Sequence, residues 1–129
     1  MQELALVAVV VPDYDEAIAH YVGDLGFELR EDTDLGDGKR WVVVAPPGST
    51  GSALLLARAS TAAQRARVGD QTGGRVFLFL HTDDFAADHR RLDDAGVEFV
   101  EGPRVEDYGT VAVFADRFGN RWDLIERPS

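Results

Sequence analysis

The sequence predicts an α+β protein built from two tandem βαβββ modules. A β-branched run, an apolar helix stripe that ends at a glycine, and three short strand patterns occur in this order twice along the chain. The two copies keep their spacing, because Asp84 follows Asp13 by 71 residues and Gly96 follows Gly26 by 70. A chain of 129 residues is long enough to bury a proper core and has the length of a single domain.

The first copy opens with a strand pattern at 7–11, which Pro12 ends. Asp13 then offers a helix N-cap, and Glu16 stands at capping-box spacing from it. Four apolar residues follow on one helix face: Ile18, Tyr21, Val22 and Leu25. Gly26 supplies the helix stop. Three strands are then predicted at 27–32, 40–47 and 52–59, and the "GDG" between the first two is a turn signal.

The second copy repeats this order with a strand at 76–80 and Asp84 as the cap. Phe85, Leu92 and Ala95 form its helix stripe, and Gly96 ends it. Its later strands are predicted at 97–102, 110–116 and 121–126. The helices should therefore lie near 13–25 and 84–95. The modules should occupy approximately 1–59 and 74–128, joined by a polar linker at 60–73 with a short helix-compatible stretch at 62–68.

The composition excludes several classes of protein. A net charge of −10 and a pI near 4.6 argue against binding to nucleic acid or to anionic membranes. The chain has no cysteine, which excludes disulfides, thiolate metal sites and thiol nucleophiles. No apolar run approaches the ~20 residues of a membrane span, and no basic region precedes the first apolar stretch as in a signal peptide. We therefore expect a soluble, cytoplasmic protein.

Two stretches carry a family resemblance. The first helix, "VPDYDEAIAHYVGDLGFEL", and the C-terminal hairpin, "VFADRFGNRWDLIE", resemble the vicinal-oxygen-chelate superfamily, which includes glyoxalase I, extradiol dioxygenases and bleomycin-resistance proteins. The resemblance covers nearly the whole chain. It implies that each module folds into a cup-shaped sheet, that two modules face each other around a pocket, and that the chain forms a homodimer.

The resemblance also implies where metal ligands would stand. In metal-dependent relatives, the ligands come from the first and last strands of each module, and these positions read Leu6, Leu55, Phe77 and Asp123 here. Leucine and phenylalanine donate no electron pair, and one carboxylate does not hold a divalent ion against water. We therefore expect no metal ligands and no cofactor. The alternative is a divalent metal such as Zn, Ni, Fe or Mn at a displaced site.

Two polar residues of the expected pocket have more than one interpretation. His81 has the strand parity of Phe77, and it is either a hydrogen-bonded residue at the pocket rim or a group that contacts substrate or exchanges protons with it. Asp123 among apolar neighbours should have a raised pKa. It is either a general base or ligand contact, or a carboxylate paired with an arginine or with backbone amides.

Aromatic residues complete the expected pocket. Trp41, Phe79 and Tyr108 are candidates for its walls, beside the apolar positions Leu6, Leu55 and Phe77; as alternatives, Trp41 and Phe79 belong to the core and Tyr108 anchors a loop. Trp122 has the opposite parity from Asp123 and should pack beneath a helix.

Two functions remain open. The first is a metal-free binding protein of the bleomycin-resistance type that encloses a small, partly aromatic molecule. The second is a lyase, isomerase or dioxygenase of the same superfamily, which uses a displaced metal site or Asp123 as a general base.

Overall fold

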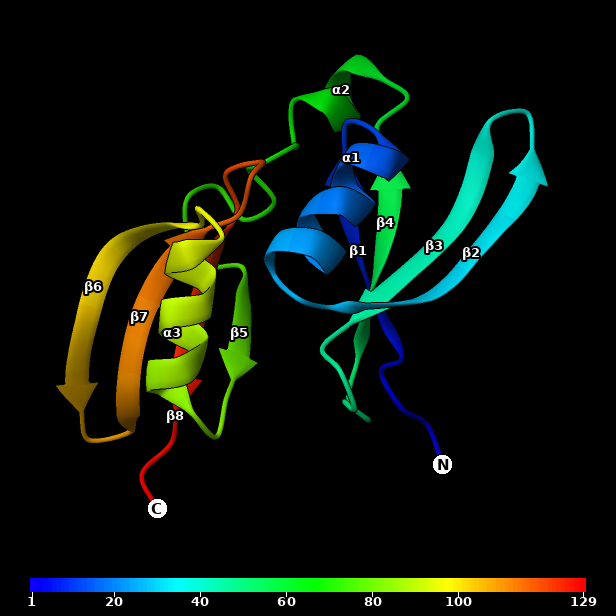
Figure 1. Cartoon of the computed structure of the whole chain (residues 1–129). Helices are drawn as coiled ribbons and strands as arrows, with labels where there is room; N and C mark the ends of the chain where they lie inside the picture. The colour runs from blue at the N-terminus through cyan, green and yellow to red at the C-terminus, as the bar shows by residue number, and fades with distance from the viewer. The chain divides into compact units, whose positions relative to one another are not determined.

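A computed structural model describes every residue of the chain, Met1–Ser129. The chain forms two compact units, Met1–Val68 and Gly69–Ser129, and each unit holds a four-stranded sheet (Figure 1). The predicted α+β class with two tandem βαβββ modules is confirmed. The polar segment predicted as a linker, 60–73, is divided between the units after Val68.

In the first unit the strand order is β1-β4-β3-β2, with β1 parallel to β4 and the other neighbours antiparallel. The last three strands follow one another through short connections, which antiparallel neighbours allow. The elements are β1 (Leu6–Val11), α1 (Tyr14–Ile18), the π-helical turn η1 (Ala19–Asp24), β2 (Glu28–Gly36), β3 (Lys39–Ala45), β4 (Ala53–Arg58) and α2 (Ala62–Arg65).

The second unit repeats this topology with the order β5-β8-β7-β6. Its first strand begins two residues later than predicted, although the backbone N–H of Phe77 already donates to the carbonyl of Arg121 at 2.8 Å. The elements are β5 (Leu78–His81), α3 (Phe85–Asp94), β6 (Glu98–Glu106), β7 (Gly109–Ala115) and β8 (Arg121–Glu126).

The helix boundaries follow the predicted caps. The Asp13 carboxylate accepts the backbone N–H of Glu16 at 2.8 Å, and the Asp84 carboxylate accepts that of Ala87 at 3.1 Å. The helical segments end at Gly26 and Gly96, whose φ angles of 80° and 85° lie in the left-handed region that favours glycine. None of the helices is long and apolar enough to cross a membrane.

The first helix departs from a regular α-helix after Ile18. Residues 19–24 form the wider π-helical turn, and the N–H of Phe27 reaches back to the carbonyl of Tyr21 at 2.9 Å. The wider turn changes the buried face, so that His20 is 4% exposed while Val22 is half-buried. The predicted apolar stripe is therefore correct for Tyr21 and Leu25. It omits the buried His20, because a pattern with the period of an α-helix does not reveal a π-helical turn.

Both long hairpins continue beyond the predicted strands. β2 and β3 meet at the two-residue turn Asp37–Gly38, whose φ angles of 56° and 78° are those of a type I′ turn. This confirms the turn signal in the sequence. β6 and β7 are also joined by two residues, Asp107 and Tyr108, but neither has the positive φ of a type I′ turn.

The core of each unit lies between the helix and one face of its sheet. In the first unit this face carries the fully buried side chains of Val9, Val11, Val42, Val44 and Leu56.

In the second unit, a row of stacked aromatic rings extends from α3 to the sheet. His89 stacks on Phe99 at 4.0 Å, Phe99 meets Phe114 edge-on, and Phe114 stacks on Trp122 at 5.7 Å. Trp122 therefore packs on the helix side of the sheet, as predicted.

Candidate functional site

The sheet face opposite the helix carries the predicted site residues of the first unit. Side chains alternate along a strand, and the register places Leu6, Trp41 and Leu55 on this second face. Leu6 and Leu55 pack against a small buried cluster of Val43, Ala45 and Ala53. Trp41 is 37% exposed at the margin of this cluster, so its ring is free on one side to meet a ligand.

The corresponding face of the second unit is more polar. Register places Phe79, Asp123 and Val113 in one row across three strands, and His81 with Ile125 in the next row. Phe79 is 61% exposed. The structure therefore brings Phe79, His81 and Asp123 to one sheet face, and Leu6, Trp41 and Leu55 to the equivalent face of the other unit.

Asp123 is a buried carboxylate without a hydrogen-bonding partner. It is 8% exposed, and its Oδ1 atom accepts no hydrogen bond. Burial raises the pKa of Asp123, the charge of Glu101 raises it further, and the charge of Arg104 lowers it. The guanidinium group of Arg104 forms ion pairs with Glu106, at 3.0 Å, and with Glu101, at 3.6 Å. In this geometry neither an arginine nor a backbone amide donates a hydrogen bond to Oδ1 of Asp123.

The other predicted residues of this unit are His81, Tyr108 and Phe77. His81 is exposed at the end of β5. Tyr108 stands at the tip of the β6–β7 hairpin, 52% exposed, and its hydroxyl accepts a long hydrogen bond of 3.5 Å from Arg104. Phe77 lies near the opposite end of β5, beside a small cavity of about 30 Å³.

A groove in the first unit brings two of the predicted residues together. It has a volume of about 540 Å³ and is lined on its apolar side by Val10, Trp41, Leu55, Leu56 and Ala57. Its polar lining consists of Tyr14, Asp37, Lys39, Arg40, Arg58, Ser60 and Gln64. Trp41 and Leu55 were expected from the sequence, whereas the polar lining was not.

The groove exists because β3 and β4 separate. They pair only at Val42–Val44, three residues, whereas β7 and β8 of the second unit pair over six, from Thr110 to Ala115. Figure 1 shows β3 diverging from β4 towards the hairpin turn. Beyond Val42, residues of both strands line an opening instead of a continuous sheet.

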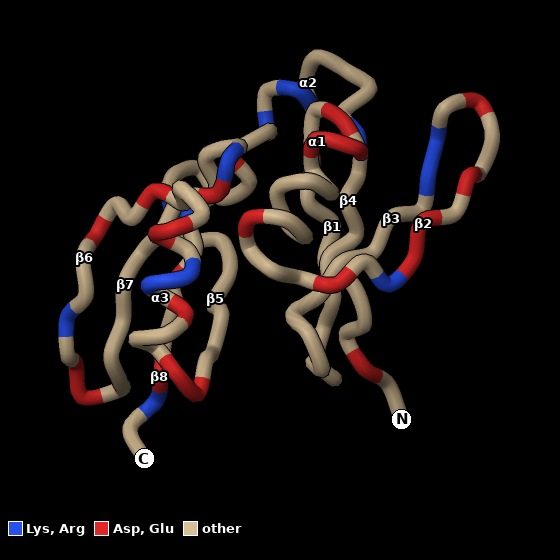
Figure 2. The backbone as a smooth tube through the Cα atoms, in the orientation of Figure 1, with Lys and Arg blue, Asp and Glu red and all other residues tan.

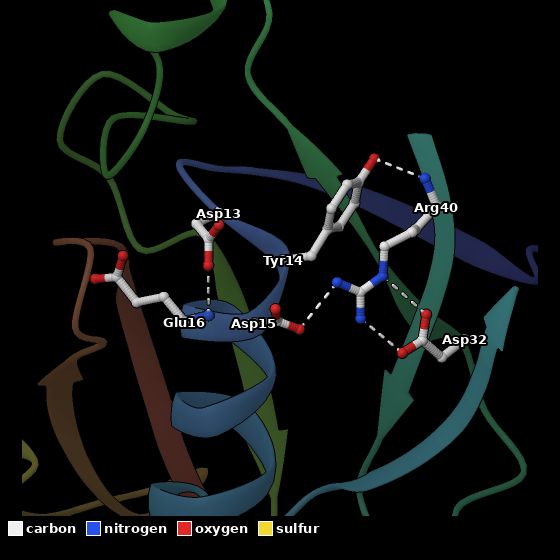
Figure 3. A network of polar contacts seen from close by, with 6 residues as sticks. All are labelled: Asp13, Tyr14, Asp15, Glu16, Asp32 and Arg40. Carbon is white, nitrogen blue, oxygen red and sulfur yellow. Dashed lines mark hydrogen bonds and ion pairs between the residues drawn. The ribbon is translucent and has the colours of Figure 1, made fainter. Parts of the chain in front are cut away.

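Tyr14 occupies this separation. Its hydroxyl accepts the backbone N–H of Arg40 at 3.2 Å, so a side chain replaces the partner that a neighbouring strand would supply (Figure 3). The equivalent first helical residue of the second unit is Phe85, which has no hydroxyl, and there the ladder continues to the strand end. This difference between the two copies was the sequence signal that could have revealed the groove.

An ion-pair network fixes the wall formed by β3. The guanidinium group of Arg40 donates to Asp32 at 2.7 Å and to Asp15 at 2.9 Å, which ties β3 to β2 and to α1 (Figure 3). These carboxylates hold the pKa of Arg40 above its usual range, and Arg40 lowers the pKa of Asp32. Figure 2 shows the basic start of β3 beside the largely acidic β2.

The residues at the implied ligand positions do not fit a metal ion. Leu6, Leu55 and Phe77 offer no donor atom, and Asp123 is the one carboxylate among the four positions. No group of three or more histidine, aspartate or glutamate side chains in the structure could hold a metal. The geometry therefore supplies an acidic group and apolar surfaces, and no set of ligands.

The chain belongs to the glyoxalase/bleomycin resistance protein/dioxygenase superfamily. The model of this superfamily matches residues 3–124. An uncharacterized protein of Shewanella frigidimarina is 56% identical over 97% of this chain and 93% of its own length.

Solved structures of the same fold include proteins of similar sequence. UcmS2 is 32% identical with a TM-score of 0.84, over 97% of this chain and 98% of its own. TnmS3, described as an antibiotic binding protein from Streptomyces sp. CB03234, is 32% identical with a TM-score of 0.79, over 99% and 98% of the two chains.

Proposed function

We propose that the chain is a metal-free binding protein for a small, partly aromatic molecule. The observation that carries the proposal is the groove of the first unit, where the exposed face of Trp41 stands beside an apolar floor that includes Leu55 and Ala57. Its volume of about 540 Å³ lies within the ~300–1,000 Å³ that is common for small-molecule pockets. An aromatic wall and an apolar floor with polar groups at the margin suit a planar, mostly apolar ligand.

Two further observations support this function. The positions that would hold a metal are apolar apart from Asp123, and apolar side chains bind organic surface better than ions. TnmS3, at 32% identity over nearly the whole chain, is described as an antibiotic binding protein. An aromatic natural product is therefore the first class of ligand to examine.

The proposal is tested by a thermal-shift screen of small aromatic natural products against the wild-type chain. A ligand at 100 times its Kd stabilises the native state by ~2.7 kcal/mol, which such a screen detects readily. Trp41→Ala should abolish the shift. Leu35→Ala is the matched control, because Leu35 is an exposed apolar side chain of the same unit outside the groove. A shift that survives in Trp41→Ala would contradict binding in the groove.

Asp123 favours a second candidate function, general-base catalysis by an enzyme of the same superfamily. A buried carboxylate with a raised pKa and an Oδ1 atom that accepts no hydrogen bond is suited to act as a general base. Compounds found by the screen would be followed by NMR for conversion to product. Turnover by wild-type protein that is lost in Asp123→Asn, with binding retained, would establish this function in place of simple binding.

A further inference from the structure

We propose that the groove of the first unit takes an anionic, planar aromatic ligand. The inference rests on the binding function proposed above and names the chemical class of the ligand. It comes from the residues that line the groove, which include three cations and one acid, whereas the whole chain has a net charge of −10.

The charges that line the groove do not cancel. Its lining contains Lys39, Arg40 and Arg58 but only one acid, Asp37. Arg40 is paired with two carboxylates outside this lining, Asp15 and Asp32, each within 2.9 Å. The side chains of Lys39 and Arg58 form no ion pair and no hydrogen bond with the rest of the chain, and the guanidinium group of Arg58 lies over the Tyr14 ring. Two cationic side chains without a carboxylate partner, Lys39 and Arg58, therefore line one opening of a protein whose net charge is −10, and Lys39 is its only lysine.

Arg58 reaches across the opening between the two strands. Its guanidinium carbon lies 5.5 Å from the ring centroid of Tyr14. Its Nη2 atom lies 3.4 Å from the position that a Cβ atom would occupy on Gly38, in the β2–β3 turn. The side chain of Arg58 therefore starts on β4 and ends beside the far hairpin, with donor hydrogens that no carboxylate of the chain accepts.

The second unit indicates that the fold does not require these cations. The registers Val42↔Leu56 and Ala112↔Leu124 align the two sheets, so that Gly109 matches Lys39, Val111 matches Trp41 and Glu126 matches Arg58. The same scaffold thus carries glycine, valine and an acid at these positions. The combination of cations and tryptophan is a property of the groove and not of the βαβββ module.

The surrounding groups match an anion joined to a flat ring. Strand alternation places Lys39 and Trp41 on the same side of β3, so a ring stacked on the indole brings an attached oxyanion towards the ammonium group. The Oε1 atom of Gln64 already accepts two hydrogen bonds from Ser60, at 2.7 and 3.0 Å, which leaves the amide nitrogen to donate. Aromatic carboxylates, sulfonates and phenolates have this combination of ring and oxyanion.

The test compares two fluorescent probes of similar shape. 1-Anilinonaphthalene-8-sulfonate is an anion, and N-phenyl-1-naphthylamine is its uncharged counterpart. We expect wild-type protein to bind the sulfonate more tightly than the neutral probe. The double variant Lys39→Gln with Arg58→Gln should lower the affinity for the sulfonate by at least about tenfold, and should change the affinity for the neutral probe by less than about twofold. Arg90→Gln with Arg127→Gln is the control, because it removes the same charge from exposed positions outside the groove.

The outcomes separate this inference from the function on which it rests. Equal weakening of both probes, or unchanged sulfonate binding in the Lys39 and Arg58 variant, would overturn the anionic class while leaving a binding groove in place. Failure of both probes to bind the wild-type groove, with Trp41→Ala giving the same signal as wild type, would overturn the binding function itself. Circular dichroism of each variant establishes that the comparison concerns folded protein.

Discussion

At Asp123 the second unit keeps a carboxyl group where the first unit has Leu55. The backbone position, the strand and the sheet face are equivalent, so the difference lies in the side chain alone. A buried carboxylate without a partner costs free energy, since it loses hydration and gains no hydrogen bond at Oδ1. The chain tolerates this cost at a position where leucine is compatible with the fold.

The raised pKa of Asp123 predicts how its replacement depends on pH. Because the folded state binds this proton more tightly than the unfolded state, Asp123 contributes stability below its unfolded pKa, near ~3.9, and loses that contribution as pH rises through the folded pKa. Asp123→Asn should therefore raise the Tm at pH 7.5, with a gain that shrinks towards pH 3. Calorimetry over this range measures it. The exposed Asp107→Asn is the control, and an equal gain at both pH values would contradict the prediction.

Because the residues at the implied ligand positions are apolar apart from Asp123, we expect metal ions neither to bind the protein nor to change its stability. Zinc, nickel, iron or manganese added to purified protein should not raise its Tm, whereas a real site at 100 times its Kd would stabilise the fold by ~2.7 kcal/mol. Elemental analysis should find well below one equivalent of metal. Stoichiometric metal that is lost in Asp123→Ala would contradict this prediction and favour the metalloenzyme alternative.

Among the structural elements, those determined by neighbouring residues were predicted well. The caps at Asp13 and Asp84 and the turn at Asp37–Gly38 depend on contacts over two to four residues, which a sequence displays directly. The π-helical turn η1 was missed, because the conformation of Gly26 and the packing of Phe27 beyond it decide how the helix ends.

Part of the candidate site could also be predicted from the sequence. Trp41 and Leu55 were both named from the sequence as candidate pocket residues, and the register places them on one sheet face. The roles of Lys39 and Arg58 were not predictable, because they depend on where β3 leaves β4, and that separation depends on a hydrogen bond from Arg40 to Tyr14, which is 26 residues away in the chain.

The first helix contains two glycines with opposite roles. Gly23 is exposed within η1 and a Cβ atom there would meet nothing within 4 Å, so Gly23→Ala should stabilise the chain by about 0.5–1 kcal/mol through lower entropy of the unfolded state. Gly26 has a φ of 80°, and Gly26→Ala should destabilise by about 1–2 kcal/mol. Urea denaturation measures both changes. Equal effects of the two substitutions would contradict this account of the helix end.

For the whole molecule we propose a homodimer. Large apolar side chains remain exposed on both units, among them Trp41 at 37%, Phe79 at 61% and Val105 at 84%. Burying such surface against a second copy would stabilise it at ~25 cal/mol per Å². Light scattering at micromolar concentration should give about twice the chain mass of 14.1 kDa. A monomer over that whole concentration range would contradict the proposal.

The long strands at the margins of the two sheets limit how copies of the chain can associate. β2 and β6 are edge strands of nine residues each, and an unpaired edge of that length can template aggregation. β2 is exposed throughout and carries Glu28, Glu31, Asp32 and Asp34, so a second β2 beside it would bring like charges together. β6 contains Pro103 and an irregular register. Edge-to-edge growth into fibres through β2 or β6 is thereby disfavoured.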